Sequence, residues 1–331
     1  MEKMILLEAG LTLVAVFVLT VVIAHFMIPL LKGFKAGVRI LEIGPRWHKS
    51  KEGTPIMGGI CFIMAILVSV LVMILIAAWR DETKGLLPMA LTLVLAVGNG
   101  LIGFVDDFCK LVKKQNEGLR PWQKLVLQIL VALLYLVAMV RFGGLTTALY
   151  IPYFGVELEL GIFYYALALI VILGFVNSVN LTDGIDGLAS SVTLIVGLFF
   201  AVAACFIMDR ALLLTSACII GGTLGFLMYN FHPARVFMGD TGSLFLGGIV
   251  VGAAFQLNNP LILLTVGFIY LCEAVSVILQ VGYFKLTHGK RLFKMAPIHH
   301  HFEKCGWGEN RIVFTFSGIT LLFAVLSVWG I

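Results

Sequence analysis

Charge is the scarcest property of this chain of 331 residues. Only 12% of the residues are charged and 60% are hydrophobic, whereas soluble domains carry roughly 25% charged residues. A soluble fold could not bury so much apolar surface in a core of its own. The composition therefore excludes an ordinary soluble protein and predicts one integral membrane domain over residues 1–331.

Signatures of several other protein classes are absent as well. The six cysteines are scattered and form no CxxC pair, which argues against a disulfide framework or a zinc site. No GxxxxGK[ST] or HExxH motif occurs, so a nucleotide-hydrolysing motor and a zinc metalloprotease are unsupported. The N-terminal apolar run is too long for a cleavable signal and lacks a small-residue cleavage site. We expect it to be a first spanning helix.

Long apolar runs recur along the whole chain, and each is long enough to cross about 30 Å of hydrocarbon as a helix. The outer loop at 143–160 contains a Pro and a Gly among strand-forming residues, which favours a small hairpin. We therefore expect an all-α integral membrane bundle of ten transmembrane helices with a small outer β-hairpin. The ninth run is expected to break near Gln280 and Gly282 and so to offer a groove for a lipid tail. The ten runs span residues 5–31, 56–79, 86–105, 122–142, 160–179, 188–208, 211–231, 242–257, 261–284 and 311–330.

Basic residues divide the loops between these runs into two families. Most of the 23 Lys and Arg residues lie in alternate loops, which the positive-inside rule assigns to the cytoplasm. Both termini would then lie outside. Five of the seven aspartates fall at cytoplasmic ends of runs, where acids that face a bundle interior are functional candidates. These five are Asp106, Asp107, Asp183, Asp186 and Asp240.

The pair Asp106-Asp107 ends a glycine-rich apolar run in GNGLIGFVDDFCKLVKK. Adjacent side chains point in different directions on a helix. One carboxylate could therefore bind a metal or a basic partner while the other takes a proton. The alternative is a solvated helix end that Lys110, Lys113 and Lys114 neutralise.

Asp183 and Asp186 lie in NLTDGIDGLA. Three residues apart, they would share one face of a helix. The alternative is that Thr182 or Asp183 caps a helix that begins near Ile185. A cap explains one acid better than two, so we favour a binding role.

Asp240 lies in the glycine-rich turn FMGDTGSL, just before the eighth run. Such an acid could take a cation while the helix N-terminus favours a phosphate. Phe237 could stack on a base. A plain capping turn is the alternative.

Two stretches with histidine or lysine side chains also lie in the loops assigned to the cytoplasm. Three consecutive histidines, residues 299–301, suit hydrogen bonding to phosphate or proton shuttling near neutral pH. Lys49 and Lys51 in RWHKSKEGTPIMGG could grip an anionic phosphate. For the histidines the alternative is a solvated loop. For Lys49 and Lys51 it is a loop that faces anionic lipid.

These features would share one cytoplasmic-side active-site cleft. Carboxylates without cysteine ligands suit a hard cation, Mg²⁺ with Mn²⁺ as a substitute, rather than zinc. Mg²⁺ is usually held by one or two carboxylates together with substrate phosphates. A basic surround adds the chemistry of phosphoryl transfer on a diphosphate substrate.

Five motifs in sequence order, GTPIMGG, GFVDD, NLTDGIDGLA, FMGDTGSL and MAPIHHHFE, resemble those of the polyprenyl-phosphate N-acetylhexosamine-1-phosphate transferases. The first and last favour the branch of that family that uses UDP-N-acetylmuramoyl-pentapeptide. The resemblance implies that undecaprenyl phosphate attacks the sugar-linked phosphate, that UMP leaves and that lipid I remains in the bacterial inner membrane. The sequence leaves open both a direct displacement and a two-step route through a covalent aspartyl-phosphate. It also implies the ten spans and the outward termini. A relative that uses UDP-N-acetylglucosamine is the alternative.

The resemblance further implies roles for individual residues. Asp106 would deprotonate the lipid phosphate, and Asp240 would bind Mg²⁺. Asp106 and Asp107 are further candidate metal ligands, and Asp107 and His299 complete the candidate catalytic set. Phe237 would stack on uracil. The candidate substrate-binding residues are Lys49, Thr54, Lys110, Lys124, Asn180, Asp183, Asp186, Phe237, Ser243, Gln280, His300 and His301.

The implied partners are undecaprenyl phosphate, UDP-N-acetylmuramoyl-pentapeptide and membrane lipids. Nucleic acid is a poor partner, because the basic residues lie in short loops between spans. A homodimer is left open by the apolar outward faces. A cation transporter with the same acids as a relay is the alternative from another class, but transporters carry such acids near the membrane midplane. Release of UMP would exclude it.

Overall fold

The computed structural model describes residues 2–33, 51, 53–83, 85–113 and 118–331. Lys49 lies outside these ranges. The described chain is mostly helical, with a two-stranded sheet as its one other regular element in these ranges. All six cysteines are free.

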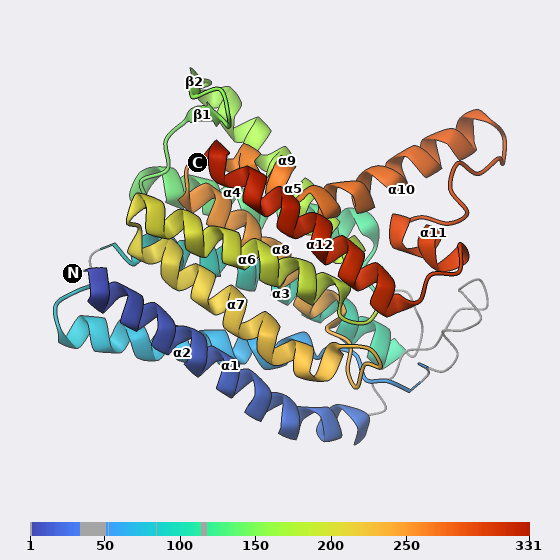
Figure 1. Ribbon diagram of the computed structural model, residues 1–331, viewed down its shortest axis with the longest axis horizontal. Coiled ribbons are helices and arrows are strands. Elements are labelled where there is room, and N and C mark those ends of the chain that lie inside the picture. The colour runs from blue at the N-terminus through green and yellow to red at the C-terminus, as the bar shows by residue number, and fades with distance from the viewer. Residues whose placement is uncertain (1, 34–50, 52, 84, 114–117) are drawn as a thin grey trace.

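The long helices form one bundle (Figure 1). Nine helices of the described part are long and apolar enough to cross a membrane, which makes the chain a multi-pass membrane protein. These nine are α1 (Glu2–Gly33), α2 (Gly59–Trp79), α3 (Leu87–Lys113), α4 (Pro121–Phe142), α5 (Ile162–Thr182), α6 (Leu188–Ile207), α7 (Arg210–Asn230), α10 (Phe268–Leu286) and α12 (Glu309–Ser327), the last being extended by η3 (Val328–Gly330).

The eighth predicted run forms α8 (Gly239–Gln256), which lies at the centre of the bundle. Every residue of α8 from Thr241 to Gln256 is buried, so this helix has no face for lipid. Its glycines allow neighbouring backbones to approach closely. A Cβ on Gly247 would overlap the backbone of Val176 in α5, for example. Helix α8 is not among the nine apolar helices named above, so a total of ten spans stays a prediction.

The expected hairpin is present between α4 and α5. Strands β1 (Ala148–Ile151) and β2 (Val156–Glu159) pair antiparallel, with Leu149 opposite Leu158. Tyr153 in the connecting turn donates its hydroxyl to Oγ1 of Thr265 at 2.9 Å. The hairpin is thereby fastened to the end of the bundle that carries both chain termini (Figure 1).

The ninth predicted run is interrupted, but not where the sequence indicated. The helix α10 continues through Gln280 and Gly282 without a break. The interruption lies at Gly267, between the short segments η2 (Pro260–Ile262) and α9 (Leu263–Val266) and the start of α10. A Cβ on Gly267 would press on the Leu263 carbonyl oxygen and the Phe175 ring, which explains a glycine at this point.

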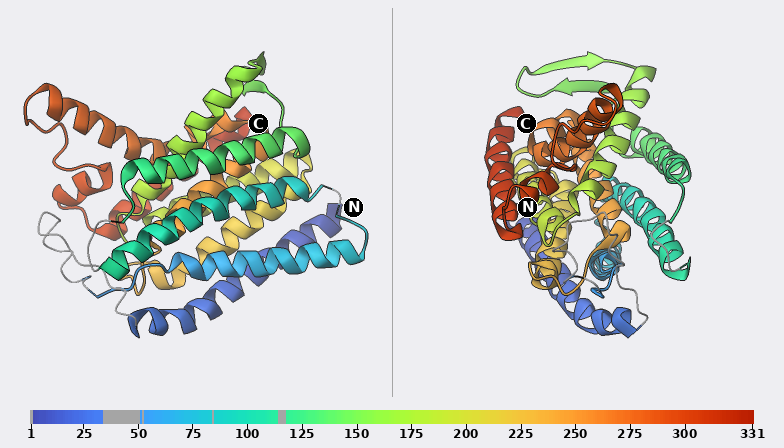
Figure 2. Two further views of the ribbon diagram at one scale, coloured as in Figure 1. Left: turned by 180° about the vertical axis from the view of Figure 1, so that it is seen from behind. Right: turned by 90° about the vertical axis from the view of Figure 1, so that its right-hand side faces the viewer.

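The first half of α10 is buried in the bundle as far as Ser276, and its far half projects from the bundle, as the left view of Figure 2 shows. Apolar side chains on its far half are exposed, among them Ile278, Leu279 and Phe284. The chain then returns through a loop to the short helix α11 (Ile298–Lys304), which carries the three histidines. Helix α11 lies at the end of the bundle opposite to the termini and the hairpin (Figure 1).

Candidate active site

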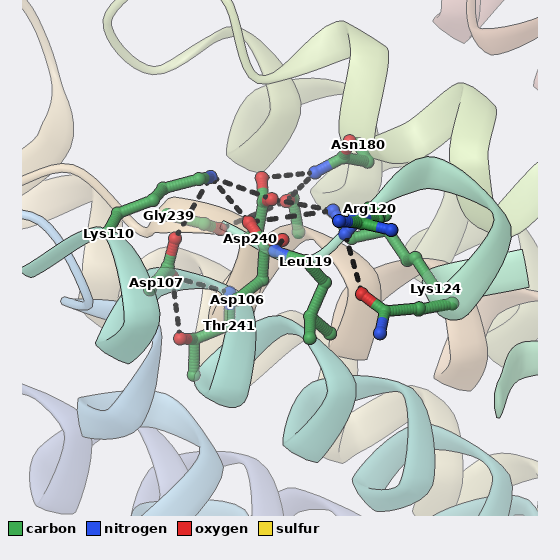
Figure 3. A network of polar contacts seen from close by, with 12 residues as sticks. Asp106, Asp107, Lys110, Leu119, Arg120, Lys124, Asn180, Gly239, Asp240 and Thr241 are labelled. Carbon is green, nitrogen blue, oxygen red and sulfur yellow. Dashed lines mark hydrogen bonds and ion pairs between the residues drawn. The ribbon is translucent and has the colours of Figure 1, made fainter. Parts of the chain in front are cut away.

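Three aspartates predicted from the sequence meet at the end of the bundle opposite to the termini. Asp106 and Asp107 lie near the end of α3, and Asp240 lies in the first turn of α8 (Figure 3). Asp106 and Asp107 are each 2% exposed. Carboxylate oxygens of the three lie within 4.8 Å of one another. The structure thus brings residues 106 and 240 together although 133 other residues separate them along the chain.

A glycine permits this meeting. A Cβ on Gly103 would overlap the backbone carbonyl of Asp240, so α3 and α8 touch here backbone to backbone. On the other side of the same helix end, a Cβ on Gly59 of α2 would overlap the Cα of Gly242. Small residues at helix crossings allow such approaches in membrane proteins. The close approach of α2, α3 and α8 at the site therefore depends on one glycine in each of these helices.

Two lysines hold the acids together. The Nζ of Lys110 lies 2.6 Å from Oδ2 of Asp106, 3.1 Å from Oδ2 of Asp240 and 3.7 Å from Oδ1 of Asp107. The Nζ of Lys124, which lies in the first turns of α4, is 2.7 Å from Oδ2 of Asp240. The ammonium of Lys110 therefore stands at the point on which one oxygen of each aspartate converges (Figure 3).

The remaining oxygens of the pair on α3 are engaged by the backbone. The Leu119 N–H donates to Oδ1 of Asp106 at 2.8 Å. The N–H and the hydroxyl of Thr241 both donate to Oδ2 of Asp107, at 2.9 and 2.7 Å. Asp107 thereby satisfies one of the free N–H groups in the first turn of α8. One oxygen of each acid is thus held by these hydrogen bonds, and the other oxygen faces the ammonium of Lys110.

This donor set fits a hard divalent cation. All three ligand groups are carboxylates, and no sulfur or imidazole ligand belongs to the group. One oxygen of each carboxylate already faces a positive charge, the ammonium of Lys110. A metal ion bound here would take over part of the charge that Lys110 and Lys124 now balance.

Helix α5 joins the site through its last turn. The amide of Asn180 donates to Oδ1 of Asp240 at 2.9 Å and to Oγ of Ser243 at 2.8 Å. Ser243 in turn donates to the Gly239 carbonyl at 2.9 Å. Asn180, predicted to bind substrate, therefore holds the carboxylate oxygen of Asp240 that the lysines do not contact (Figure 3). Ser243, also predicted to bind substrate, accepts from Asn180 and so helps to position it.

Asp183 and Asp186 do not share a helix face, which corrects the sequence-based geometry. Residues 183–187 form a turn between α5 and α6. The capping alternative is also wrong, because α6 begins at Leu188 after Gly187 in the left-handed conformation, with no side-chain cap. Thr182 instead donates to the Ser178 carbonyl within α5. Residue 187 has a positive φ of 76°, a conformation that glycine adopts most easily, so the chain turns here before α6 begins.

Asp186 is the centre of a second cluster. Its Oδ1 lies 2.6 Å from Nζ of Lys51, and its Oδ2 accepts from the Ala234 N–H at 3.0 Å and lies 2.9 Å from Nδ1 of His232. Glu309, at the start of α12, accepts from Lys51 at 2.7 Å and from the Asp186 N–H at 3.0 Å. This cluster ties together three loops and the last helix.

Two residues predicted to bind substrate lie beside this second cluster. The Nζ of Lys51 lies 5.9 Å from the ring centroid of Phe237, the residue expected to stack on uracil. The Phe237 N–H donates to the Pro55 carbonyl at 2.9 Å, which fixes the ring next to the GTPIMGG loop. Thr54 belongs to that loop and is partly buried. Its N–H donates to the Lys51 carbonyl at 3.1 Å.

The two acids of this turn titrate in opposite directions. Burial raises the pKa of the Asp186 carboxyl, but hydrogen bonds from Lys51 and Ala234 outweigh burial and leave the pKa below its ordinary value. For Asp183, burial and the repulsion from Asp240 and Asp107 raise the pKa well above its ordinary value. The more distant charge of Lys51 lowers this pKa only in part, and the Asp183 carboxyl has no hydrogen bond or ion pair within the described part of the chain.

The lowered pKa of Asp186 predicts how its contribution to stability depends on pH. The ionised carboxylate stabilises the fold, so its contribution is complete above the ordinary aspartate pKa of about 3.9 and is lost as pH falls through the lowered folded-state pKa. We expect Asp186→Asn to lower the free energy of unfolding by about 1–3 kcal/mol at pH 7. The difference from the wild type should narrow below about pH 4. Unfolding in detergent micelles at several pH values measures both effects.

The control for that measurement is Asp81→Asn, at an exposed turn in the loop after α2. Asp81 has a positive φ of 57°, which Asn adopts as readily, so this variant should match the wild type at every pH. A destabilisation by Asp186→Asn that stays constant from pH 7 to below pH 4 would contradict the ion-pair account.

Each of the three histidines on α11 has a different partner. Nδ1 of His299 lies 3.0 Å from Oε2 of Glu273, and Nδ1 of His300 lies 2.6 Å from Oε2 of Glu303. Nδ1 of His301 accepts from the Lys294 N–H at 3.1 Å. His299 is fully buried, so the solvated-loop alternative is wrong for this residue.

Gln280 acts on the backbone of the loop before α11. Its Oε1 accepts from the N–H groups of Leu292 and Phe293 at 3.1 and 2.8 Å, and its Nε2 donates to the Phe293 carbonyl at 3.3 Å. Gln280 therefore anchors the returning loop to α10. A contact with substrate stays a prediction for this residue.

Sequence reasoning missed several members of these clusters. Thr241 lies within a quoted motif, but its bond to Asp107 depends on how α3 packs on α8. His232 lies in the loop after α7 and Glu309 is the first residue of α12, and the one sequence signal for either was a polar residue at the end of an apolar run. Glu273 lies inside an apolar run, where an acid is a functional candidate by itself.

Known proteins match this chain over most of its length. The family model described as Glycosyl transferase family 4 matches residues 87–258, which contain the three aspartates of the first cluster. A phospho-N-acetylmuramoyl-pentapeptide-transferase of Clostridioides difficile (strain 630) is 44% identical over 324 residues, which cover 97% of either chain. The transferases of the same name from Heliobacterium modesticaldum and Listeria monocytogenes are 46% and 42% identical, and the matches cover 92% and 96% of either chain.

Identity at this level over nearly the whole length is accompanied by the acidic cluster at one end of a membrane bundle. The chain belongs to the phospho-N-acetylmuramoyl-pentapeptide-transferases.

Proposed function

We propose that this chain transfers phospho-N-acetylmuramoyl-pentapeptide from its UDP-linked form to undecaprenyl phosphate, with release of UMP and formation of lipid I. The names of its relatives support this donor over UDP-N-acetylglucosamine. The observation that carries the proposal is the convergence of Asp106, Asp107 and Asp240 on one positively charged point at the end of a membrane bundle. Such a centre suits a reaction between two anionic phosphates, which must be brought together against their repulsion.

The metal in this proposal is Mg²⁺, with Mn²⁺ as a substitute. Asp240 would hold it, with the free oxygens of Asp106 and Asp107 as further ligands. When bound, the ion would neutralise developing charge on the diphosphate. Lys110 and Lys124, released from part of their ion pairing with Asp240, would contact phosphate oxygens. Holding both phosphates in line is the main contribution of the chain's own residues.

Asp106 is the candidate general base for the lipid phosphate. A phosphate monoester has a second pKa of about 6, so it is already mostly ionised near pH 7. Proton removal therefore contributes little there, and positioning dominates. An oxygen of the lipid phosphate attacks the sugar-linked phosphorus, the bond to the UMP oxygen breaks, and UMP leaves with the electron pair.

The second cluster would bind the nucleoside. Phe237, held by the Pro55 carbonyl, would offer its ring to uracil, and Asp183 and Asn180 would line the pocket beside the diphosphate. Lys49, Thr54, Ser243, Gln280, His300 and His301 complete the proposed contacts. The lipid tail would lie along the exposed apolar face of the far half of α10, where that helix projects from the bundle.

The proposed location is the bacterial plasma (inner) membrane. The excess of Lys and Arg in the loops at the site end supports a cytoplasmic active site and outward termini. Exposed apolar side chains over the outside of the bundle suit membrane lipids, and a homodimer is a further option for the same faces.

A UMP-release assay tests the function. We expect purified protein in micelles to release UMP from UDP-N-acetylmuramoyl-pentapeptide when undecaprenyl phosphate and Mg²⁺ are both present, and to stop when EDTA removes the metal. UDP-N-acetylglucosamine in place of the pentapeptide donor is the control. Release of UMP from that control alone would replace the proposed donor, and no release from either would overturn the proposed function.

A further inference from the structure

A buried acid and a buried histidine form a pair where α10 meets α11. Oε2 of Glu273 lies 3.0 Å from Nδ1 of His299, and the two side chains are 0% and 1% exposed. Among the residues that the structure describes, Oε1 of Glu273 and Nε2 of His299 have no hydrogen-bond partner. Polar atoms at such burial are costly unless something binds them. The pair therefore lacks a purely structural explanation.

The free nitrogen of His299 faces the turn between α5 and α6. A Cβ on Gly184 would overlap Nε2 of His299, so a side chain on residue 184 would exclude the imidazole from its place. Gly184 follows Asp183, whose carboxyl has no hydrogen bond or ion pair within the described ranges and a raised pKa. The unpartnered Nε2 thus lies beside the turn that carries Asp183, the acid of the site whose carboxyl is without a hydrogen bond or ion pair in the described ranges.

The chemistry of the pair determines which nitrogen of His299 carries a proton. An ionised carboxylate accepts hydrogen bonds and donates none, so Nδ1 must be the donor toward Glu273. In the neutral ring, Nε2 then carries the lone pair, and in the protonated ring it is an N–H donor. A carboxylate behind a histidine commonly fixes both the tautomer and the ring orientation in this way.

We propose that Glu273 is the positioning residue of this enzyme for His299, and that it directs Nε2 toward phosphate oxygens of the substrate bound beside the Asp183 turn. The proposal rests on the proposed function, because the phosphate is that of the UDP-linked donor or the lipid. Glu273 itself touches neither substrate. Glu273 lies on the buried first half of α10, and its bond to His299 also holds α11 against this part of the bundle.

The test uses Glu273→Gln, which keeps the size of the side chain and removes its charge. The Gln amide can donate to Nδ1 as readily as its oxygen can accept, so the tautomer is no longer fixed. We expect kcat for UMP release to fall by about 10- to 100-fold. The KM for the UDP-linked donor should change by less than about 3-fold, and Glu273→Asp should recover part of the loss.

Tyr270→Phe is the matched control. Tyr270 lies one turn earlier on α10, is fully buried, and has its hydroxyl 2.6 Å from Oγ1 of Thr193. The variant removes one buried hydrogen bond of the same helix without touching a histidine. We expect its thermal stability to fall at least as much as that of Glu273→Gln, with kcat within about 2-fold of the wild type.

Nitrogen chemical shifts of ¹⁵N-histidine-labelled protein give a second readout that needs no turnover. Signals of His299 are assigned by their loss in His299→Gln. We expect the neutral imidazole of the wild type to carry its proton on Nδ1 and not on Nε2, and we expect a mixture of the two tautomers in Glu273→Gln. An unchanged tautomer and an unchanged kcat in Glu273→Gln would overturn the proposal, as would an equal loss of kcat in Tyr270→Phe. If the wild type releases no UMP, the proposed function fails, and the nitrogen shifts alone still decide whether Glu273 fixes His299.

Discussion

Asp240→Asn is expected to lower the rate of UMP release by about 10³-fold, because it removes the acid on which both lysines and the proposed Mg²⁺ depend. Oδ2 of Asp240 lies 3.1 Å from Lys110 and 2.7 Å from Lys124, and Oδ1 accepts from Asn180. Asn keeps the shape but not the charge, so two ammonium groups would face a neutral amide. The measurement is kcat over a range of Mg²⁺ concentrations, and added Mg²⁺ should not restore the rate.

Asp209→Asn is the control for this variant. Asp209 precedes α7 at the opposite end of the bundle, and its Oδ1 accepts from the Leu212 N–H at 2.8 Å as an N-cap. Asn caps a helix about as well as Asp, so activity and stability should stay near those of the wild type. A rate for Asp240→Asn within about tenfold of the wild type would contradict the central role of this acid.

Gly103→Ala is expected to abolish activity by a different route, through the packing of α3 on α8. The added methyl would overlap the backbone of Asp240, which cannot move aside as a flexible side chain could. Overpacking usually costs about 1–3 kcal/mol, and we expect this substitution to reach or exceed the upper end. The pair on α3 would be displaced from Asp240, so the remaining folded protein should lose at least about 100-fold in kcat. Thermal unfolding and UMP release measure the two effects separately.

Gly174→Ala is the matched glycine variant. Gly174 lies within α5 and a Cβ built on it has no atom within 4 Å, so the methyl would extend into open space. Ala favours a helix by up to about 1 kcal/mol over Gly, so this variant should be as stable as the wild type or more so. If Gly103→Ala unfolds and turns over like Gly174→Ala, the close approach of α3 and α8 is not what builds the site.

The spans and the location of the acids could be predicted from the sequence. A transmembrane helix needs only a local run of apolar residues, because the bilayer itself supplies the burial. The alternation of loops then places Asp106, Asp183 and Asp240 at one end of the bundle without knowledge of any contact. The hairpin followed from local turn chemistry at Pro152 and Gly155 in the same way.

Lys110, four residues after Asp106, could be predicted as a partner of the pair on α3, but the partners that lie on other helices could not. Hydropathy does not distinguish α8, which contacts protein on all sides, from a helix that faces lipid. The break at Gly267 rather than at Gln280 depends on the Phe175 ring of another helix.

What the sequence by itself determined is therefore a multi-pass bundle with acids, lysines and histidines at one end, because hydropathy and charge act along the chain. The tertiary structure decided that one oxygen from each of three aspartates converges on Lys110, that Asp186 pairs with Lys51, and that Glu273 lies behind His299. Asp106 and Asp107 lie within four residues of Lys110, but the other contacts join residues far apart in the chain. Hydropathy and charge along the chain do not encode which distant residues meet, and at the first cluster Gly59 and Gly103 let the helices approach closely enough for the meeting.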